Sequence, residues 1–138
     1  MNLQLLFTPV QVILMTSTAS ANTSPTLPPC PDSPNCVSSQ VGDYHRIEPF
    51  KVSGDAGSAL GKLREILARL SDTTVISVDD TMIRVEFKTN LGFVDDGLFL
   101  LDAASNVIQV RSAARLGYWD LGKNRRRMEE IRQSYQKE

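Results

Sequence analysis

A regular alternation of apolar and charged side chains between Met82 and Lys88 constrains the fold more than any other feature of the chain. Ile83, Val85 and Phe87 occupy every second position, and the residues between them carry charges. Successive side chains of a β-strand point to opposite faces of a sheet, so this pattern predicts a strand with one buried and one solvated face. The chain is therefore expected to contain a sheet of which this strand is a half-buried member.

Four further segments have the β-branched and apolar composition of strands and are bounded by turn residues. The expected strands cover residues 44–52, 74–78, 82–88, 93–101 and 107–111. Pro49 lies inside the first of them and implies an edge position or a bulge, because proline cannot donate to a strand ladder. Asp79 and Asp80 are expected to form the turn of a hairpin that joins the second strand to the third.

Two segments have the three-and-four spacing of amphipathic helices. Asp55 can cap the first, whose expected apolar stripe is Ala59, Leu60, Leu63, Ile66, Leu67 and Leu70. Asp120 can cap the second, whose expected inner face is Leu121, Asn124, Met128, Ile131 and Tyr135. The basic residues expected on its solvated side are Lys123, Arg125, Arg126, Arg127 and Arg132.

The order of these elements, β-α-β-β-β-β-α, predicts an α+β fold. We expect a single antiparallel sheet of four to five strands with two helices packed on one face. The 138 residues suffice for one domain with a substantial core. Residues 44–138 are expected to form that domain, and residues 22–43 an extended Pro-rich segment that contains a disulfide loop.

Residues 1–21 have features of a targeting leader. Residues 3–15 are mostly apolar, and Ala19-Ser20-Ala21 has the small side chains of a signal cleavage site. No Lys or Arg precedes the apolar run, which departs from the usual leader. The run is also too short to indicate a membrane span. We therefore expect export to a periplasm or an organelle lumen, with no stable membrane span after cleavage.

Cys30 and Cys36 are the only cysteines, and the five residues between them include two prolines. In an oxidising compartment such a pair is expected to close a small disulfide loop. A metal site is a weaker alternative, because it needs more ligands and His45 is the only histidine. A catalytic redox pair is also weaker, because it usually has two residues between its thiols.

The segment from Arg111 to Arg127 contains the only Trp and follows an expected strand. Residues 111–138 contain eight Lys or Arg and four Asp or Glu, whereas the whole chain has a net charge of −1. The nearly neutral total argues against general nucleic-acid binding. Arg111 and Arg115, a glycine turn and the first N–H groups of a helix would together form an anion-binding concavity. The alternative is that both arginines pair with carboxylates of the same domain.

Asp95 and Asp96 are neighbouring carboxylates, an arrangement that invites an acid–base interpretation. On a strand they point to opposite faces, so no close dyad is expected. A turn over residues 102–105 would set Asp96 opposite Arg111 and Asp95 opposite Ser112 in the antiparallel register. This register predicts an ion pair between Asp96 and Arg111.

Three separated motifs resemble those of domain of unknown function family 1499. They lie within residues 30–39, 93–96 and 111–127, and the resemblance covers nearly all of the chain after the leader. The family has no assigned activity, and its members occur in bacteria, including cyanobacteria, and in photosynthetic eukaryotes. The thylakoid lumen is therefore the expected alternative to a periplasm. Carried over by position, the characteristic residues are Cys30, Asn35, Cys36, Asp95, Asp96, Arg111, Ser112, Arg115, Gly117, Asp120, Gly122, Asn124 and Arg126.

The expected function is a non-catalytic exported module that binds an anionic small molecule or an acidic protein surface. The residues expected to bind the ligand are Asp95, Asp96, Arg111, Ser112, Arg115, Tyr118, Asp120, Asn124 and Arg126. The Tyr118 and Trp119 rings are expected to wall a shallow pocket. With one histidine, no Ser–His–Asp or Cys–His arrangement is indicated, and no cofactor or metal is expected. The alternatives are an enzyme that uses the same polar groups and a purely structural role for them; a monomer is expected in each case.

Overall fold

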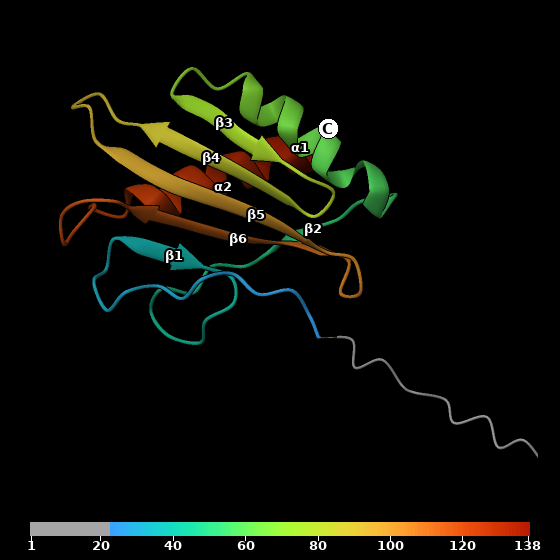
Figure 1. Cartoon of the computed structure of the whole chain (residues 1–138), viewed down its shortest axis with the longest axis horizontal. Helices are drawn as coiled ribbons and strands as arrows, with labels where there is room; N and C mark the ends of the chain where they lie inside the picture. The colour runs from blue at the N-terminus through green and yellow to red at the C-terminus, as the bar shows by residue number, and fades with distance from the viewer. Residues whose placement is uncertain (1–22) are drawn as a thin grey trace, which may run out of the picture.

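The computed structural model describes residues 23–138, so the leader expected over residues 1–21 lies outside the described range. The helices and strands of the described chain (Figure 1) are β1 (Cys36–Ser38), β2 (Phe50–Lys51), α1 (Ala56–Ala68), β3 (Thr73–Val78), β4 (Met82–Lys88), β5 (Val94–Asp102), β6 (Val107–Ala114) and α2 (Lys123–Lys137). Neither of these helices combines the length and the apolar composition that crossing a bilayer requires.

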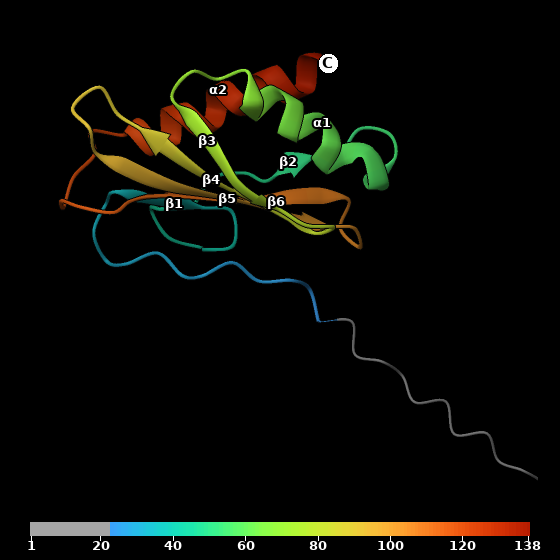
Figure 2. The same cartoon turned by 45° about the horizontal axis from the view of Figure 1, so that its top comes forward.

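The strands form one sheet in the order β1-β6-β5-β4-β3, and the short β2 also pairs with β6. All pairs between these strands are antiparallel. Both helices lie on the same face of the sheet (Figure 2). The α+β class, the single antiparallel sheet and the placement of the helices are thus confirmed. The described chain contributes six strands to this sheet, rather than the expected four to five.

The additional strand, β1, lies beside the disulfide loop and pairs with residues 111–113 of β6. Three residues are too few to show the alternation of a strand, so no sequence pattern indicates β1. Within the expected first strand, residues 44–52, only Phe50 and Lys51 form a strand. Pro49 has no N–H to donate, and its carbonyl accepts a hydrogen bond from Arg132 at 2.6 Å.

The register between β5 and β6 differs by two residues from the expected one. Asp96 pairs with Ala113 instead of Arg111, because the turn covers residues 103–106. Asn106 closes this turn with a left-handed φ of 55°, a conformation that asparagine tolerates better than most residues. A shift of two residues leaves every side chain on its expected face, whereas a shift of one would have exchanged the faces.

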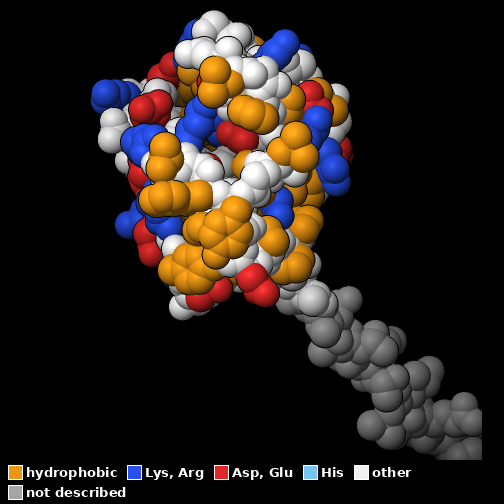
Figure 3. All heavy atoms as spheres, turned by 90° about the vertical axis from the view of Figure 1, so that its left-hand side faces the viewer, with side chains coloured by type: hydrophobic (Ala, Val, Ile, Leu, Met, Phe, Trp, Pro, Cys, Tyr) orange, Lys and Arg blue, Asp and Glu red, His pale blue; other side chains and the backbone are white. Residues whose placement is uncertain are grey.

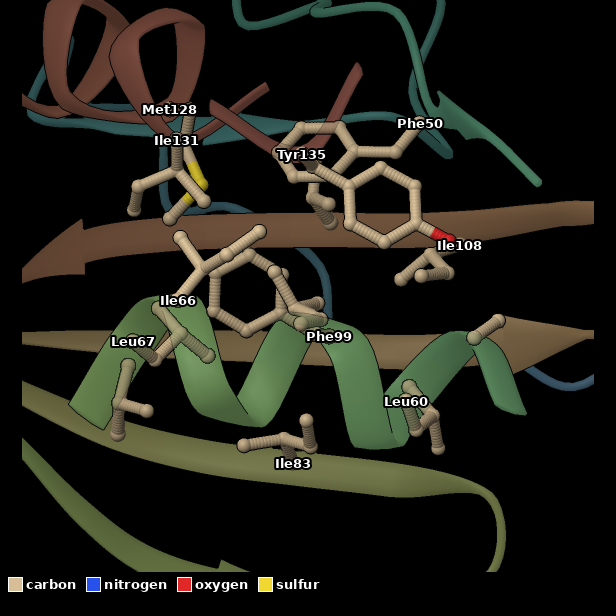
Figure 4. Packing of buried hydrophobic residues seen from close by; sticks show 14 of the residues in the cluster. Phe50, Leu60, Ile66, Leu67, Ile83, Phe99, Ile108, Met128, Ile131 and Tyr135 are labelled. Atoms are coloured by element: carbon tan, nitrogen blue, oxygen red, sulfur yellow. The ribbon is translucent and has the colours of Figure 1, made fainter. Parts of the chain in front are cut away.

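The core lies between the helices and the sheet, and the apolar stripe expected for α1 faces into it. Figure 4 shows Ile66 and Leu67 of α1 packed beside Phe99 of β5. Burial of a leucine such as Leu67 contributes about 1.5–3 kcal/mol relative to exposure. Asp55 caps α1 as expected, because its carboxylate accepts the Ser58 N–H at 3.1 Å.

The opposite face of the sheet is partly covered by residues 23–35, which run along it in Figure 2 before the chain enters β1. Leu27 from this segment packs on Leu98 and Leu100 of β5. The side chain of Gln40 accepts the Leu27 N–H at 2.6 Å and thereby fixes the segment. The two faces of β5 therefore present different environments to neighbouring side chains, with the main core and α2 on one side and a thinner cover on the other.

Candidate functional site

The two neighbouring acidic residues of β5 point to opposite faces of the sheet, as expected. Asp95 pairs with Ala114 rather than with Ser112, and its side chain is buried on the helix-covered face. Arg127 Nη2 lies 2.9 Å from Asp95 Oδ2, and the two side chains are 8% and 5% exposed. The guanidinium also lies over the Phe87 ring, with its Cζ 4.4 Å from the ring centroid. An ion pair therefore lies inside the protein between β5 and α2.

The sequence predicts Arg127 on the solvated side of α2, and that prediction is wrong. Position 127 follows Asn124 by three residues, so the two side chains share the inner face of the helix. The carboxylate of Asp95 offsets the cost of burying the guanidinium. Leu121, predicted on the inner face, is instead 67% exposed, because α2 begins only at Lys123.

A chain of hydrogen bonds joins β6 to the start of α2. Ser112 Oγ donates to Asn124 Oδ1, and Asn124 Nδ2 donates to Asp120 Oδ2 at 2.7 Å. Asp120 also accepts the backbone N–H groups of Gly122 at 2.9 Å and Asn124 at 3.0 Å. The N-cap position is Gly122 rather than the expected Asp120, but the Asp120 carboxylate still satisfies the free N–H groups of the helix start.

Arg115 lies on the other face of the sheet, where two carboxylates neutralise it. Its Nε and Nη2 donate to the two carboxylate oxygens of Asp96 at 2.9 and 2.7 Å, and Nη2 also donates to Glu86. The hydrogen bonds to Asp96, followed by the one to Glu86, raise the pKa of Arg115. All three side chains are between 36% and 45% exposed, so these are surface ion pairs.

Arg111 shares this face but makes a different contact. Its Nη2 donates to the Pro29 carbonyl at 3.1 Å. Burial lowers the pKa of Arg111, and the charge of Asp96 opposes that shift. A hollow of about 310 Å³ on this face is lined by Arg115 and Asp96 but not by Arg111. The two arginines therefore do not line one open concavity there, and ligand binding by either stays a prediction.

A larger pocket of about 500 Å³, here called the loop-end pocket, lies between the β4–β5 turn and the loop that joins β6 to α2. Both connections lie at the left-hand end of Figure 1. Figure 3 looks onto this end and shows hydrophobic side chains around a hollow. The large apolar residues that line the pocket, here called the apolar rim, are Leu91, Phe93, Leu116, Trp119 and Leu121. They are 51–84% exposed, and exposed apolar groups that cluster in this way are typical of binding sites.

The loop-end pocket includes only part of the predicted site. Asp95 and Asp120 line it. Ser112 and Asn124 are fully buried and do not line it. Tyr118 belongs to the same loop as Trp119, and its ring is exposed without lining the pocket.

Leu121 has an unusual backbone conformation for a leucine. Its φ is 55°, in the left-handed region, which costs a residue with a side chain about 1–2 kcal/mol. The Leu121 carbonyl accepts a hydrogen bond from Arg126 Nη1 at 2.6 Å. Arg126, one of the residues predicted to bind the ligand, therefore holds the loop in place. An exposed apolar side chain gains little from packing, and strain retained at such a position points to a role in binding.

Sequence reasoning did not identify four residues of the apolar rim, namely Leu91, Phe93, Leu116 and Leu121. The first three lie next to Gly92 or Gly117, which adopt positive φ values of 84° and 87°. Turns lie at the surface, so large apolar residues beside a glycine turn are a signal that would have pointed to them. Trp119 lines the pocket, as expected.

The predicted disulfide between Cys30 and Cys36 is confirmed, with a Cα–Cα distance of 5.8 Å. Among residues 23–138, no group of three or more His, Cys, Asp or Glu side chains is arranged to hold a metal ion.

Comparison with protein families gives a match over most of the chain. The model of a family described as "Protein of unknown function (DUF1499)" matches residues 26–134. Searches of curated proteins and of solved structures gave no match.

Proposed function

The chain belongs to the DUF1499 family, whose description assigns no activity, and we propose that it is a non-catalytic module that binds a small amphipathic molecule in the loop-end pocket. The observation that carries the proposal is the exposed apolar rim above the buried carboxylate of Asp95. A volume of about 500 Å³ lies within the range of small-molecule sites. Such sites combine an apolar lining with a few fixed polar groups, which is the composition of this pocket.

The apolar rim supports a ligand with an apolar body. Its five side chains come from two separate connections and converge on one hollow. Covering them would remove apolar surface from water, which contributes about 25 cal/mol per Å². Four of the five side chains are more than 65% exposed, so a bound ligand would bury apolar surface that the fold leaves in contact with water.

The carboxylate of Asp95 favours a ligand with a polar group that donates a hydrogen bond. The contact between Arg127 Nη2 and Asp95 Oδ2 is short, but its N–H direction does not make an aligned hydrogen bond. Asp95 also lines the pocket, so its carboxylate is the proposed acceptor for a donor group of the ligand. A hydroxyl or amide N–H of a ligand would satisfy it, whereas a ligand carboxylate placed there would meet a like charge.

The anionic ligand expected from the sequence receives less support from this pocket. Three carboxylates line it, from Asp72, Asp95 and Asp120, and two ammonium groups, from Lys88 and Lys123. This balance does not select an anion. We therefore assign the apolar body and the donor group to the ligand, and the binding of an anion becomes one arm of the test.

An enzymatic role receives no comparable support. Among the residues predicted to bind the ligand, only Ser112 and Tyr118 carry a hydroxyl group, and the side chain of Ser112 is fully buried. Its Oγ donates to the amide oxygen of Asn124, which cannot act as a general base. A binding role needs no reactive group and is consistent with these contacts.

A matched set of naphthalene probes tests the proposal. 2-Naphthol has an apolar body and a hydroxyl donor, 2-methoxynaphthalene lacks the donor, and 2-naphthoate carries an anion. A hydrogen bond to a charged acceptor contributes about 1.5–3 kcal/mol. We therefore expect 2-naphthol to bind roughly tenfold or more tightly than the other two. Affinities would come from NMR titration of the ¹⁵N-labelled chain, with shifts expected at residues of the apolar rim.

Two variants locate the binding. Leu116→Ser should weaken 2-naphthol severalfold, whereas Ile76→Ser, which changes an exposed apolar residue that does not line the pocket, should leave the affinity unchanged. Equal affinities for 2-naphthol and its methyl ether would remove Asp95 from the proposal. No saturable binding of any probe, or an unchanged affinity in Leu116→Ser, would refute the proposed function itself.

A further inference from the structure

We propose that Asn35 is a positioning residue for the loop-end pocket and that the Cys30–Cys36 disulfide controls the pocket through it. The contacts that position the wall of the pocket all lie within the chain. The effect on ligand affinity rests on the proposed function.

The side chain of Asn35 holds the loop that forms the wall of the pocket. Its Nδ2 donates to the Gly117 carbonyl at 2.6 Å across 82 residues of sequence. Gly117 lines the pocket between two residues of the apolar rim, Leu116 and Trp119. Asn35 itself is 4% exposed, so water does not readily replace this hydrogen bond.

The backbone of Asn35 contacts the two elements on either side of that loop. Its carbonyl accepts the Ala114 N–H, at the end of β6, at 3.0 Å. The same carbonyl accepts Asn124 Nδ2, at the start of α2, at 3.4 Å. One residue therefore contacts the end of β6, the loop and the start of α2, and the orientation of the loop depends on where Asn35 lies.

The disulfide fixes the segment that carries Asn35. Asn35 directly precedes Cys36, and the bond to Cys30 closes the chain around it. Within that loop, Ser33 Oγ donates to Asn35 Oδ1 at 2.7 Å and thereby turns the amide so that its Nδ2 faces Gly117. With the disulfide broken, residues 30–34 lose their covalent closure, and the loop that places Ser33 and Asn35 gains conformational freedom.

The redox step needs a dithiol as reductant. Dithiothreitol breaks the Cys30–Cys36 bond, both sulfur atoms receive a proton, and the reductant becomes a cyclic disulfide. Cys36 is 1% exposed, whereas Cys30 is partly exposed, so attack is expected on the Cys30 sulfur. Reoxidation reverses the step.

Trp119 reports on the wall without any ligand. It is the only Trp of the chain, it lines the pocket, and its side chain is 70% exposed. Movement of the loop changes the solvent exposure of the ring, which alters its emission maximum and its quenching by acrylamide. The amide shift of Gly117 provides a second reading next to the hydrogen bond itself.

The experiment uses the full chain in four forms: oxidised, reduced with dithiothreitol, Asn35→Asp and Asn106→Asp. Asn35→Asp keeps the size and the acceptor for Ser33 but cannot donate to Gly117. Asn106→Asp is the matched control, because Asn106 Nδ2 donates to the Val52 carbonyl at 3.2 Å at the opposite end of β6. Circular dichroism establishes that each form is folded before it is compared.

We expect the reduced form and Asn35→Asp to show the same direction of change in Trp119 quenching and in the Gly117 shift. Their affinity for 2-naphthol should fall at least about fivefold, and reoxidation should restore the affinity of the reduced form. The Asn106→Asp control should match the oxidised chain in all three readings. Should Asn35→Asp fail to fold, reduction and reoxidation of the natural chain decide the question.

Unchanged Trp119 quenching and an unchanged Gly117 shift in both the reduced form and Asn35→Asp would overturn the inference. This outcome differs from failure of the proposed function, in which the probes do not bind the oxidised chain. The spectroscopic readings then still show whether Asn35 positions the wall.

Discussion

Asp95 and Asp96 are consecutive residues with the same side chain, and each faces an arginine, yet they occupy opposite environments. The Asp95–Arg127 pair lies on the helix-covered face with side chains 5% and 8% exposed. The Asp96–Arg115 pair lies on the other face with side chains 42% and 45% exposed. Because side chains alternate along a strand, two identical neighbouring residues lie in different environments, one in the protein interior and one at the hydrated surface.

The difference shows that the environment of an ion pair decides its energetic role. At the surface, water screens both charges, and such a pair contributes at most about 1 kcal/mol. In the interior both charges have lost their hydration, so each depends on the other. Asp95 and Arg127 together hold β5 to α2 beneath the loop-end pocket, whereas Asp96 and Arg115 join β5 to the residue that follows β6, where water competes.

The largest effect is expected for Asp95→Asn. The amide cannot compensate the buried guanidinium of Arg127, so the free energy of unfolding should fall by about 3–5 kcal/mol. Urea unfolding followed by circular dichroism measures this change. The double variant Asp95→Leu with Arg127→Met removes both charges and should recover most of the loss. A double variant as unstable as Asp95→Asn would contradict the assignment of the cost to an unpaired buried charge.

A smaller but clear loss is expected for Gly97→Ala, two residues further along the helix-covered face. A Cβ at this position would lie 2.4 Å from Phe87 Cε2 and 2.6 Å from Val85 Cγ2. Relief of this overlap requires movement of two buried side chains, and the free energy of unfolding should fall by about 1–3 kcal/mol.

Gly61→Ala is the control for that substitution. Gly61 lies in α1, and nothing is within 4 Å of an added Cβ there. Alanine favours a helix over glycine by about 0.5–1 kcal/mol, so this variant should be more stable than the natural chain. Equal effects of the two substitutions in urea unfolding would show that the space around Gly97 does not decide the outcome.

The sequence alone predicts those parts of the fold that show a full period. The α1 stripe extends over three turns, and the strand over residues 82–88 shows more than three alternations, so both were identified correctly. The opposite orientation of Asp95 and Asp96 follows from the same periodicity. β1 has three residues and no period, and only the sheet edge offered by β6 defines it.

The candidate site was predicted less well, because it depends on contacts between distant segments. Arg127 lies in a run of three arginines, and only the buried Asp95 distinguishes it from its neighbours. The apolar rim combines a turn near residue 91 with a loop near residue 119, and their proximity follows from the strand order. A one-dimensional pattern contains neither relation.

The smallest effect is expected for Asp96→Asn, which breaks the surface pair and leaves the fold in place. Arg115 keeps its contact with Glu86, and both charges are largely hydrated, so the free energy of unfolding should fall by less than about 1 kcal/mol. Urea unfolding in low salt and again in about 1 M NaCl measures the change, which should shrink at high salt as screening weakens the pair. A loss as large as that of Asp95→Asn, or one insensitive to salt, would mean that exposure does not set the difference between the two faces.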